Sequence, residues 1–315
     1  MKELRIVFMG TPDFAVTTLA QLVDANYTIV GVITAPDRPA GRGRKLQQSA
    51  VKKYALEKSL PILQPTNLKD ETFVATLKQL DANLQIVVAF RMLPKVVWSM
   101  PEYGTFNLHA SLLPHYRGAA PINWAIINGE VETGATTFFI DDKIDTGEII
   151  LQEKISINAD ETAGALHDRL MVMGAKLVEK TVSQIQNNTV TSSKQETTGT
   201  LKSAYKIHKE TCEVNWNTPL DTIYNHIRGL SPYPASWTTL ENGNESIFLK
   251  IFTVSKEAEE HNNSIGKVIF DKKEMKVAVD GGYINLLEIQ LPGKRKMKTK
   301  DVLNGLKLEE NSKMI

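Results

Sequence analysis

Three polar side chains of this sequence have the types and the spacing needed for acyl transfer. Asn107 and His109 lie two residues apart in the segment NLHASLLP, and Asp145 opens the tripeptide DTG about 36 residues after the histidine. Together they supply an amide donor, an imidazole and a carboxylate, which can stabilise an oxyanion and move a proton. Such a set could pass an acyl unit to an amine without a covalent enzyme intermediate.

Asn107 and His109 follow an apolar run and precede a loop that Pro114 marks. In a strand, residues two apart point to the same face, so the two side chains should lie together. The place just after such a strand is also where an α/β sheet usually exposes its functional residues. A lone histidine at a strand end more often makes a structural hydrogen bond, so the hypothesis depends on the carboxylate as well.

The tripeptide at Asp145 has other interpretations. An aspartic protease needs two such carboxylates that share a proton, whereas the sequence has one copy. Lys143, two residues upstream, also departs from the apolar flank expected of that motif. Asp141, Asp142 and Asp145 could hold a metal, but no glycine-centred calcium-loop spacing follows. We therefore expect no metal site and assign the chemistry to Asp145.

Two basic segments could bind a polyanion. In residues 35–53, six basic side chains against Asp37 give a net charge of +5, from six minus one. In residues 294–300, five of seven side chains are basic, and the preceding Pro292-Gly293 predicts an exposed loop. A solvated loop is the commoner explanation of a charge run. The length of the first segment between a strand and a helix nevertheless favours phosphate binding through charge and counterion release. The candidate contacts are Arg38, Arg42, Arg44, Lys45, Lys294, Arg295 and Lys296.

The elements that must position these residues alternate between strands and helices in the first half of the chain. The strands are apolar throughout rather than alternating, which predicts a parallel sheet covered on both faces. We expect strands at 4–9, 27–34, 61–63, 84–89, 105–109 and 135–140. We expect helices at 14–24, 48–58 and 72–80, and a long amphipathic helix through 166–185.

The composition and the pattern of the sequence change after residue 187. Residues 187–200 are polar and rich in Thr and Ser, which is typical of a linker. Short β segments with frequent turns and little helix then predict a small antiparallel barrel or sandwich. They are expected at 212–216, 236–240, 247–254, 265–270, 276–279 and 283–291. We therefore divide the chain into domains at 1–188 and 208–315, joined by a linker at 189–207.

Composition narrows the class of protein. The 315 residues are 42% hydrophobic with a net charge of +1, which excludes a bulk polyelectrolyte. Cys212 is the single cysteine, so neither an internal disulfide nor a cysteine metal site is expected. No apolar run approaches the ~20 residues of a membrane span, and the apolar start is too short for a signal peptide. We expect a cytoplasmic protein that does not bind membranes.

Several segments together resemble the methionyl-tRNA formyltransferases, a branch of the 10-formyltetrahydrofolate-dependent formyltransferases. The resemblance covers almost the whole chain. It is carried by residues 8–14, 36–43, 107–114, 116–122, 145–147 and 228–234. The Asn-x-His and Asp-Thr-Gly set is common to all these formyltransferases and indicates only the reaction. The basic loop and the C-terminal domain indicate the tRNA branch.

The resemblance implies a Rossmann-like α/β formyltransferase domain followed by an OB-like β-barrel domain. It implies transfer of formyl from the co-substrate 10-formyltetrahydrofolate to the α-amine of initiator methionyl-tRNA, by a protein that we expect to be a monomer. Asn107, His109 and Asp145 would be catalytic, and Arg42 would engage the tRNA acceptor end. The folate site would be lined by Ser111, Leu112, Leu113 and Pro114. The sequence departs from the family after Lys45, where Gln47-Gln48-Ser49 replaces a more proline-rich stretch.

Two alternatives stay open on the sequence alone. One keeps formyl transfer but changes the acceptor to a small molecule, such as an amino sugar or glycinamide ribonucleotide. The other is a non-catalytic RNA-binding protein on a degenerate enzyme scaffold, against which the intact catalytic set argues.

Overall fold

The computed structural model describes residues 3–40, 45–196 and 199–315. The chain forms two compact units, each assembled from segments that are discontinuous in sequence. Unit 1 comprises Met1–Gly118, Thr133–Ile155 and His167–Ser203. Unit 2 comprises Ala119–Glu132, Ser156–Leu166 and Ala204–Ile315.

The main sheet of the N-terminal half has seven strands in the order β10-β9-β7-β6-β1-β2-β5. Their bounds are Arg5–Gly10 (β1), Thr28–Ile33 (β2), Ile62–Leu63 (β5), Leu84–Val88 (β6), Thr105–His109 (β7), Glu132–Phe139 (β9) and Ile149–Ser156 (β10). Strand β1 pairs in parallel with both β2 and β6, and β7 continues the parallel set beside β6. The order therefore reverses at β1, as in a Rossmann-like sheet, and confirms the predicted α/β class.

The far edge of this sheet differs from the prediction of an all-parallel sheet. Strand β9 runs antiparallel to β7, with Asn107 opposite Phe138 and His109 opposite Thr136. Strand β10 beyond it was not predicted. Its exposed and intermediate residues in QEKIS interrupt the continuous apolar pattern that marks a doubly covered strand.

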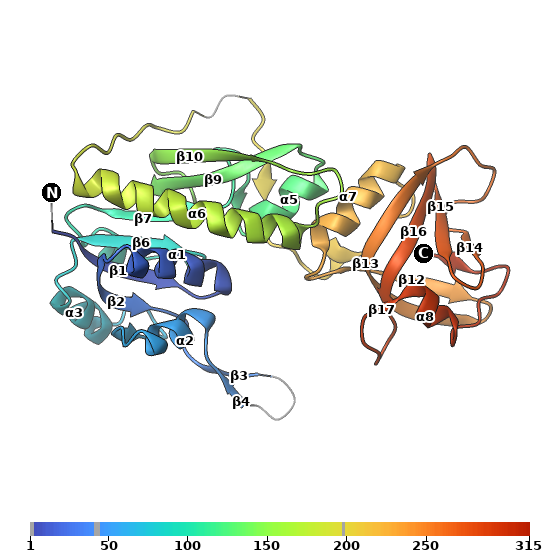
Figure 1. Ribbon diagram of the computed structural model, residues 1–315, viewed down its shortest axis with the longest axis horizontal. Coiled ribbons are helices and arrows are strands. Elements are labelled where there is room, and N and C mark those ends of the chain that lie inside the picture. Colours follow the sequence, from blue (N-terminus) through green and yellow to red (C-terminus); the bar gives the residue numbers. More distant parts are fainter. Residues whose placement is uncertain (1–2, 41–44, 197–198) are drawn as a thin grey trace. The chain divides into compact units, whose positions relative to one another are not determined.

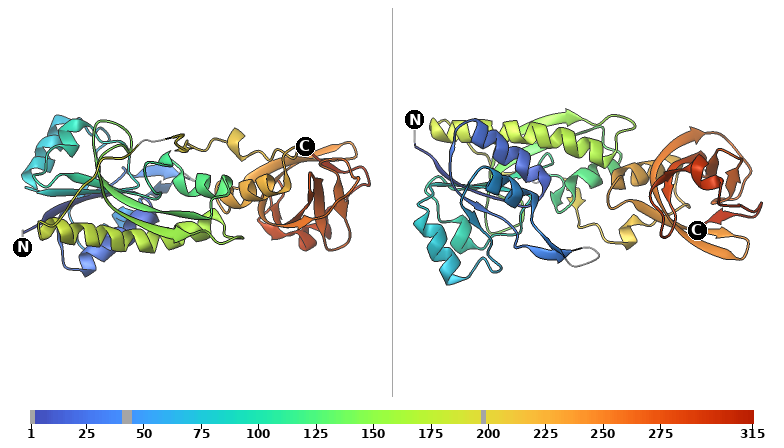
Figure 2. Two further views of the ribbon diagram at one scale, coloured as in Figure 1. Left: turned by 90° about the horizontal axis from the view of Figure 1, so that it is seen from above. Right: turned by 60° about the horizontal axis from the view of Figure 1, so that its bottom comes forward.

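Helices cover both faces of the sheet (Figures 1 and 2). Helices α1 (Asp13–Asp24) and α6 (Ala163–Gln186) lie on one face, and α3 (Glu71–Gln79) and α4 (Lys95–Trp98) on the other. Phe73 and Leu77 of α3 and Val97 of α4 are buried against β-strand residues such as Val87. Each fully buried side chain of this kind stabilises the fold by about 1.5–3 kcal/mol. The short helices α4 and α5 (Pro121–Ile127) were not predicted, because so few residues show no helical period.

Helix α6 approaches the sheet closely at Gly174, where a β-carbon would lie 2.8 Å from the Leu108 side chain. Leu108 therefore points towards α6. Its neighbours Asn107 and His109 point to the opposite face because side chains alternate along a strand.

The first basic segment contains a β-hairpin stem where the sequence predicted a structureless loop. Strands β3 (Arg38–Ala40) and β4 (Lys45–Gln47) pair antiparallel, with Arg38 opposite Gln47. Helix α2 (Ala50–Glu57) accordingly begins two residues later than predicted, and Ser49 caps it by accepting from the Lys52 amide. The two strands were missed because a short segment rich in charged residues, glycine and proline indicates a loop but says little against a hairpin.

The segment after α6 returns to unit 1. Ser193 forms a two-way backbone bridge to Ile149, with N···O distances of 2.9 and 2.8 Å. Further along, the Tyr116 amide donates to the Lys202 carbonyl at 2.6 Å. The short strands β8 (Arg117–Gly118) and β11 (Ser203–Ala204) belong to these stretches.

Most of unit 2 is a nearly closed antiparallel barrel, with the strand order β14-β15-β16-β13-β12-β18 and β17 beside β16. Its strands are Ser236–Asn242 (β12), Glu245–Ala258 (β13), Val268–Phe270 (β14), Met275–Val279 (β15), Gly282–Gln290 (β16), Met297–Lys298 (β17) and Lys313–Met314 (β18). A bridge between Lys267 and Lys313 joins the ends of β14 and β18. This closure confirms the predicted OB-like barrel.

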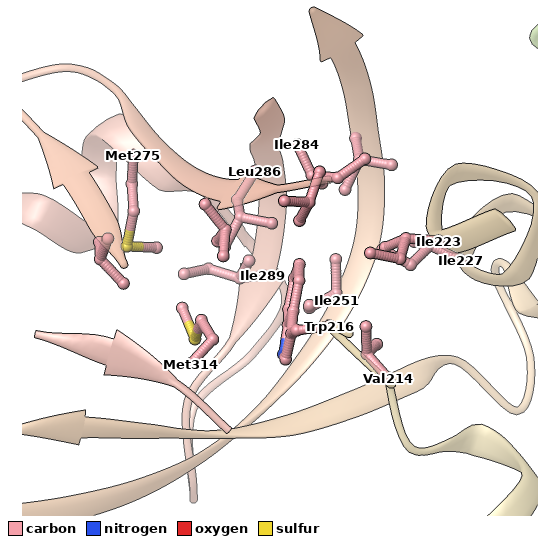
Figure 3. Close-up of a cluster of buried hydrophobic side chains, with 14 of the residues drawn as sticks. Val214, Trp216, Ile223, Ile227, Ile251, Met275, Ile284, Leu286, Ile289 and Met314 are labelled. Carbon is pink, nitrogen blue, oxygen red and sulfur yellow. The ribbon is translucent and has the colours of Figure 1, made fainter. Parts of the chain in front are cut away.

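The barrel encloses a dense apolar core, to which helix α7 (Leu220–Leu230) contributes Ile223 and Ile227 (Figure 3). Trp216 lies within this core, and its indole N–H donates to Thr238 Oγ1 at 2.8 Å. Helix α7 and the short α8 (Thr299–Leu303) correct the expectation of little helix.

The segment predicted as a strand at 212–216 is also different. It starts with the last residue of a 3-10 helix (Glu210–Cys212) and makes a single β-bridge at Glu213. Its apolar residues are buried by the barrel core, so their hydrophobicity did not signal a strand. In the part of the chain that the structure describes, no helix is long and apolar enough to cross a membrane.

Candidate active site

His109 and Asp145 meet at the C-terminal end of β7. His109 Nδ1 lies 3.8 Å from Asp145 Oδ2, and the two side chains are 7% and 14% exposed. The other ring nitrogen, Nε2, is 2.8 Å from the Tyr116 carbonyl oxygen. A carbonyl oxygen can only accept, so Nε2 carries a proton in this contact. The Tyr116 carbonyl thus sets the orientation of the imidazole and leaves Nδ1 facing the carboxylate.

The Asp145 carboxylate is held by the backbone on its other side. Its Oδ2 accepts from the Gly118 amide at 2.9 Å. The separation of 3.8 Å from His109 is too long for a direct hydrogen bond, which lies near 2.7–3.2 Å for nitrogen and oxygen. It is short enough for one proton-bearing group to reach both atoms. The pair can therefore receive a proton from a third group between them.

Each residue of the tripeptide at 145–147 has a conformation or a contact that explains its residue type. Asp145 adopts φ 54°, a left-handed conformation that non-glycine residues adopt infrequently. Thr146 donates its hydroxyl to the Asp141 carboxylate at 2.7 Å, which closes the loop that precedes it. Gly147 passes so close to the Phe139 carbonyl oxygen that a β-carbon would lie 1.6 Å from it. This loop is therefore tightly defined, and with it the place of the Asp145 carboxylate.

Asn107 carries a buried polar atom that the fold leaves unsatisfied. Its Oδ1 has no hydrogen-bond partner among the residues that the structure describes. Buried polar groups in native proteins are nearly always paired, and exceptions are concentrated at functional sites. Asn107 and His109 share the face of β7 opposite Leu108, as their spacing predicted.

The turn after β7 is held internally. Ser111 donates its hydroxyl to the His115 carbonyl at 2.7 Å, and the Ser111 carbonyl accepts from Thr136 Oγ1 at 2.7 Å. Gln152 donates to the Leu113 carbonyl at 2.8 Å. Ser111 is fully buried and Leu113 is 3% exposed. Of the four residues expected at the folate site, only the half-buried Leu112 and Pro114 present side-chain surface.

The basic residues of the first segment are only partly described. Arg38 is exposed on β3, whereas Arg42 and Arg44 lie outside the described residues. At the base of the hairpin, Lys52 Nζ lies 2.6 Å from Asp37 Oδ2. The hydrogen bond from Lys52 holds the pKa of the Asp37 carboxyl below its usual range. Lys52 is therefore engaged within the fold.

The second basic segment has an exposed part and a paired part. Lys294 and Arg295 are exposed just after the turn at Pro292-Gly293. Lys296 Nζ lies 2.9 Å from Glu288 Oε2, and this hydrogen bond lowers the pKa of the Glu288 carboxyl. The expected exposed loop ends at β17, because Met297 and Lys298 pair with Ile289 and Glu288.

A polar depression of about 490 Å³ adjoins the Asp145 loop within unit 1. It is lined by Arg117, Asp141, Asp142, Lys143, Thr146 and Gln195. In the described ranges, no group of three or more His, Cys, Asp and Glu residues is arranged to hold a metal ion.

Several contributors to this site were not identified from the sequence. The Tyr116 carbonyl and the Gly118 amide act through the backbone, so their side-chain types give no signal. Gln195, which contacts the Asp145 loop, lies in the segment predicted as a linker. Its neighbours in the sequence are also polar, so nothing in the sequence distinguished it from them.

Comparison with known proteins identifies the family. Residues 4–182 match the formyl transferase model, and residues 206–307 match the model of the formyl transferase C-terminal domain. The methionyl-tRNA formyltransferase of Flavobacterium johnsoniae is 57% identical over 314 residues, covering 100% of both chains. That of Bacteroides thetaiotaomicron is 55% identical over 318 residues, covering 99% of each chain.

A solved structure shares the fold at lower identity. The N-formyltransferase from Helicobacter canadensis, in complex with folinic acid and dTDP-3-aminofucose, is 22% identical with a TM-score of 0.66. The match covers 90% of this chain and 98% of that one. On the two domain matches and the full-length relatives, the chain belongs to the methionyl-tRNA formyltransferase family of formyl transferases.

Proposed function

We propose that the protein transfers the formyl group of 10-formyltetrahydrofolate to the α-amino group of initiator methionyl-tRNA, producing formylmethionyl-tRNA. The acceptor is assigned from one observation, the 57% identity over the full length of both chains to a methionyl-tRNA formyltransferase. The reaction itself is supported by His109 and Asp145, whose facing atoms lie 3.8 Å apart at the end of β7.

The reaction is a nucleophilic acyl substitution. The lone pair of the methionyl α-amine attacks the formyl carbon, a C–N bond forms, and the carbonyl π electrons move to oxygen. Collapse of this tetrahedral intermediate breaks the bond between the formyl carbon and N10 of the folate. The proton that the amine loses ends on N10, so formylmethionyl-tRNA and tetrahydrofolate leave in balance.

We assign the residues by what their atoms can do. Asn107 donates its amide N–H to the oxyanion, which is usually the largest single contribution to such catalysis. Asp145 takes the amine proton, and Nδ1 of His109, which has a free lone pair while Nε2 is protonated, relays it. Once Nδ1 carries that proton it can instead donate to the oxyanion. The ring does not need Asp145 for its orientation, because the Tyr116 carbonyl accepts from Nε2. A free α-amine titrates near pH ~8, so oxyanion stabilisation is the harder task.

The substrates are assigned to separate surfaces. The folate lies along the turn from Ser111 to Pro114, with Leu112 and Pro114 as the side chains in contact. The tRNA backbone is bound by basic side chains through charge and counterion release. These are Arg38, Arg42, Arg44, Lys45, Lys294, Arg295 and Lys296.

A formylation assay with three acceptors tests this function. The purified protein and 10-formyltetrahydrofolate are given initiator methionyl-tRNA, elongator methionyl-tRNA or a dTDP-amino sugar. Rapid formylation of the initiator alone is expected. Preference for the amino sugar would establish the small-molecule alternative, and no transfer to any acceptor would favour the non-catalytic RNA-binding alternative.

We further propose a cytoplasmic monomer with the domain bounds 1–188 and 208–315. Sedimentation of the purified protein with and without tRNA tests the monomer. Limited proteolysis tests the bounds: first cleavage within 189–207 would support them, whereas protection of 189–203, which belongs to unit 1, would extend the first domain.

A further inference from the structure

The Gln195 side chain connects the segment after α6 to the Asp145 loop. Its Oε1 accepts from Arg117 Nε at 3.1 Å and from Arg117 Nη2 at 2.6 Å. Its Nε2 donates to the Asp145 carbonyl at 3.0 Å and to the Gly147 carbonyl at 2.8 Å. A carboxamide has two N–H donors and an oxygen with two lone pairs, so all four positions are used.

The two carbonyls that Gln195 binds flank Thr146, at the centre of the tight loop. Asp145 has φ 54° there, a conformation that persists only where surrounding contacts impose it. The carboxylate of Asp145 is fixed separately by the Gly118 amide. Gln195 therefore contacts the backbone of the Asp145 loop on one side of the Asp145–Gly118 hydrogen bond. On the other side it contacts the side chain of Arg117, the residue before Gly118.

Anchoring of the segment does not explain these contacts. The Ser193–Ile149 backbone bridge already attaches it to β10, and the Ser192 hydroxyl donates to the Glu148 carboxylate. Neither contact involves a backbone group of Asp145 or Gly147. The hydrogen bonds of Gln195 therefore bear on the loop geometry in addition to attaching the segment.

We propose that Gln195 is a positioning residue for formyl transfer. It sets the backbone of the Asp145 loop, and thereby the distance between the Asp145 carboxylate and His109 Nδ1. This inference rests on the proposed function for its kinetic consequence. Gln195, a residue of the predicted linker, is then part of the support of the catalytic carboxylate.

The test compares Gln195→Glu and Gln195→Leu with the control Ser192→Ala. Glutamate keeps an acceptor for Arg117 but replaces both donors by an oxygen that faces two carbonyl oxygens. Leucine removes all four bonds at similar size. Both variants should lower kcat about ten- to hundredfold, the range expected when a reacting group is misplaced by up to 1 Å. KM for folate and for tRNA should change less than about threefold, because the lost interaction is not with substrate. Ser192→Ala should stay within about twofold of the wild type.

A double-mutant cycle shows whether Gln195 acts through Asp145. In single-turnover assays on an Asp145→Asn background, Gln195→Leu should lower the rate further by less than about threefold, since the two changes affect one unit. Multiplicative losses, or losses in KM rather than kcat, would overturn the proposal.

Hydrogen exchange separates this proposal from the proposed function. Amides of residues 141–148 should exchange faster in Gln195→Leu than in Ser192→Ala or the wild type, with no acceptor present. Unchanged exchange would overturn the positioning role even if formylation proceeds. If the wild type formylates no methionyl-tRNA, the proposed function fails, while faster exchange would still support the structural role of Gln195.

Discussion

Replacing Asn107 by leucine should make the protein more stable and nearly inactive. The Oδ1 atom of Asn107 is buried without a hydrogen-bond partner in the described structure. A buried polar group left unpaired costs about 1–3 kcal/mol, and an apolar group of similar shape avoids that cost. Asn107→Leu should therefore raise the free energy of unfolding by up to that amount. The same change removes the oxyanion donor and should lower kcat by about 10²–10³.

A second asparagine provides the matched control. Asn83, also half-buried and directly before β6, accepts from the Arg5 amide and donates to the Glu3 carbonyl, both at 2.8 Å. Asn83→Leu removes both hydrogen bonds and takes this acceptor from the Arg5 amide, whose bond is partly buried. It should therefore destabilise the protein by about 1–3 kcal/mol and leave kcat per folded molecule nearly unchanged. The two variants thus differ in the sign of their effect on stability.

Calorimetry and single-turnover formylation measure the two effects. A change of 1 kcal/mol shifts the unfolding midpoint by about 2–4 °C in a domain of 150–250 residues. An upward shift for Asn107→Leu and a downward shift for Asn83→Leu are expected. If both variants lose stability equally, the Asn107 carboxamide is satisfied in solution and the argument from its buried oxygen fails. Activity above about a tenth of the wild type would refute its role as oxyanion donor.

Three further outcomes are expected. Gly147→Ala should lower kcat at least tenfold because a β-carbon meets a backbone carbonyl at 1.6 Å, whereas Gly305→Ala, with its nearest contact at 4.0 Å, should not; equal activities would show that the loop tolerates displacement. Asp145→Asn should reduce kcat more than folate affinity, and an equal loss of both would recast it as a binding residue. Arg38→Ala should raise KM for tRNA and reduce the log–log salt slope by about 0.9, the value for one phosphate contact. For the exposed control Lys78→Ala an unchanged slope is expected. The same result for Arg38→Ala would show that Arg38 is solvated and makes no phosphate contact.

The sequence predicted the parallel core of the sheet well because its strands are continuous apolar runs. Strand β7 was predicted at its observed bounds, Thr105–His109. The antiparallel edge escaped prediction because strand direction depends on the connection and not on side-chain pattern. The burial of β9 is also that of a parallel strand, because six consecutive residues in its interior are buried.

The sequence predicted the part of the candidate site that is formed by side chains. Asn107 and His109 share a face because of strand alternation, and the structure brings Asp145 Oδ2 to 3.8 Å from His109 Nδ1. The groups that hold these side chains are backbone atoms of Tyr116 and Gly118, whose hydrogen bonds exist only once the chain has folded. Helix α7 escaped prediction for another reason: its buried residues include Arg228 and Gly229, which are atypical of a core helix.

The position of Gln195 bears on how this enzyme could be recombined with its relatives. The two family models end at residue 182 and begin again at residue 206, so Gln195 belongs to neither. A chimaera joined at residue 189 would inherit Asp145 from one parent and Gln195 from the other. Joining at residue 204 instead keeps both in one parent. In such an exchange, the catalytic part of the chain should therefore extend past α6 to Lys202, whose carbonyl accepts from the Tyr116 amide.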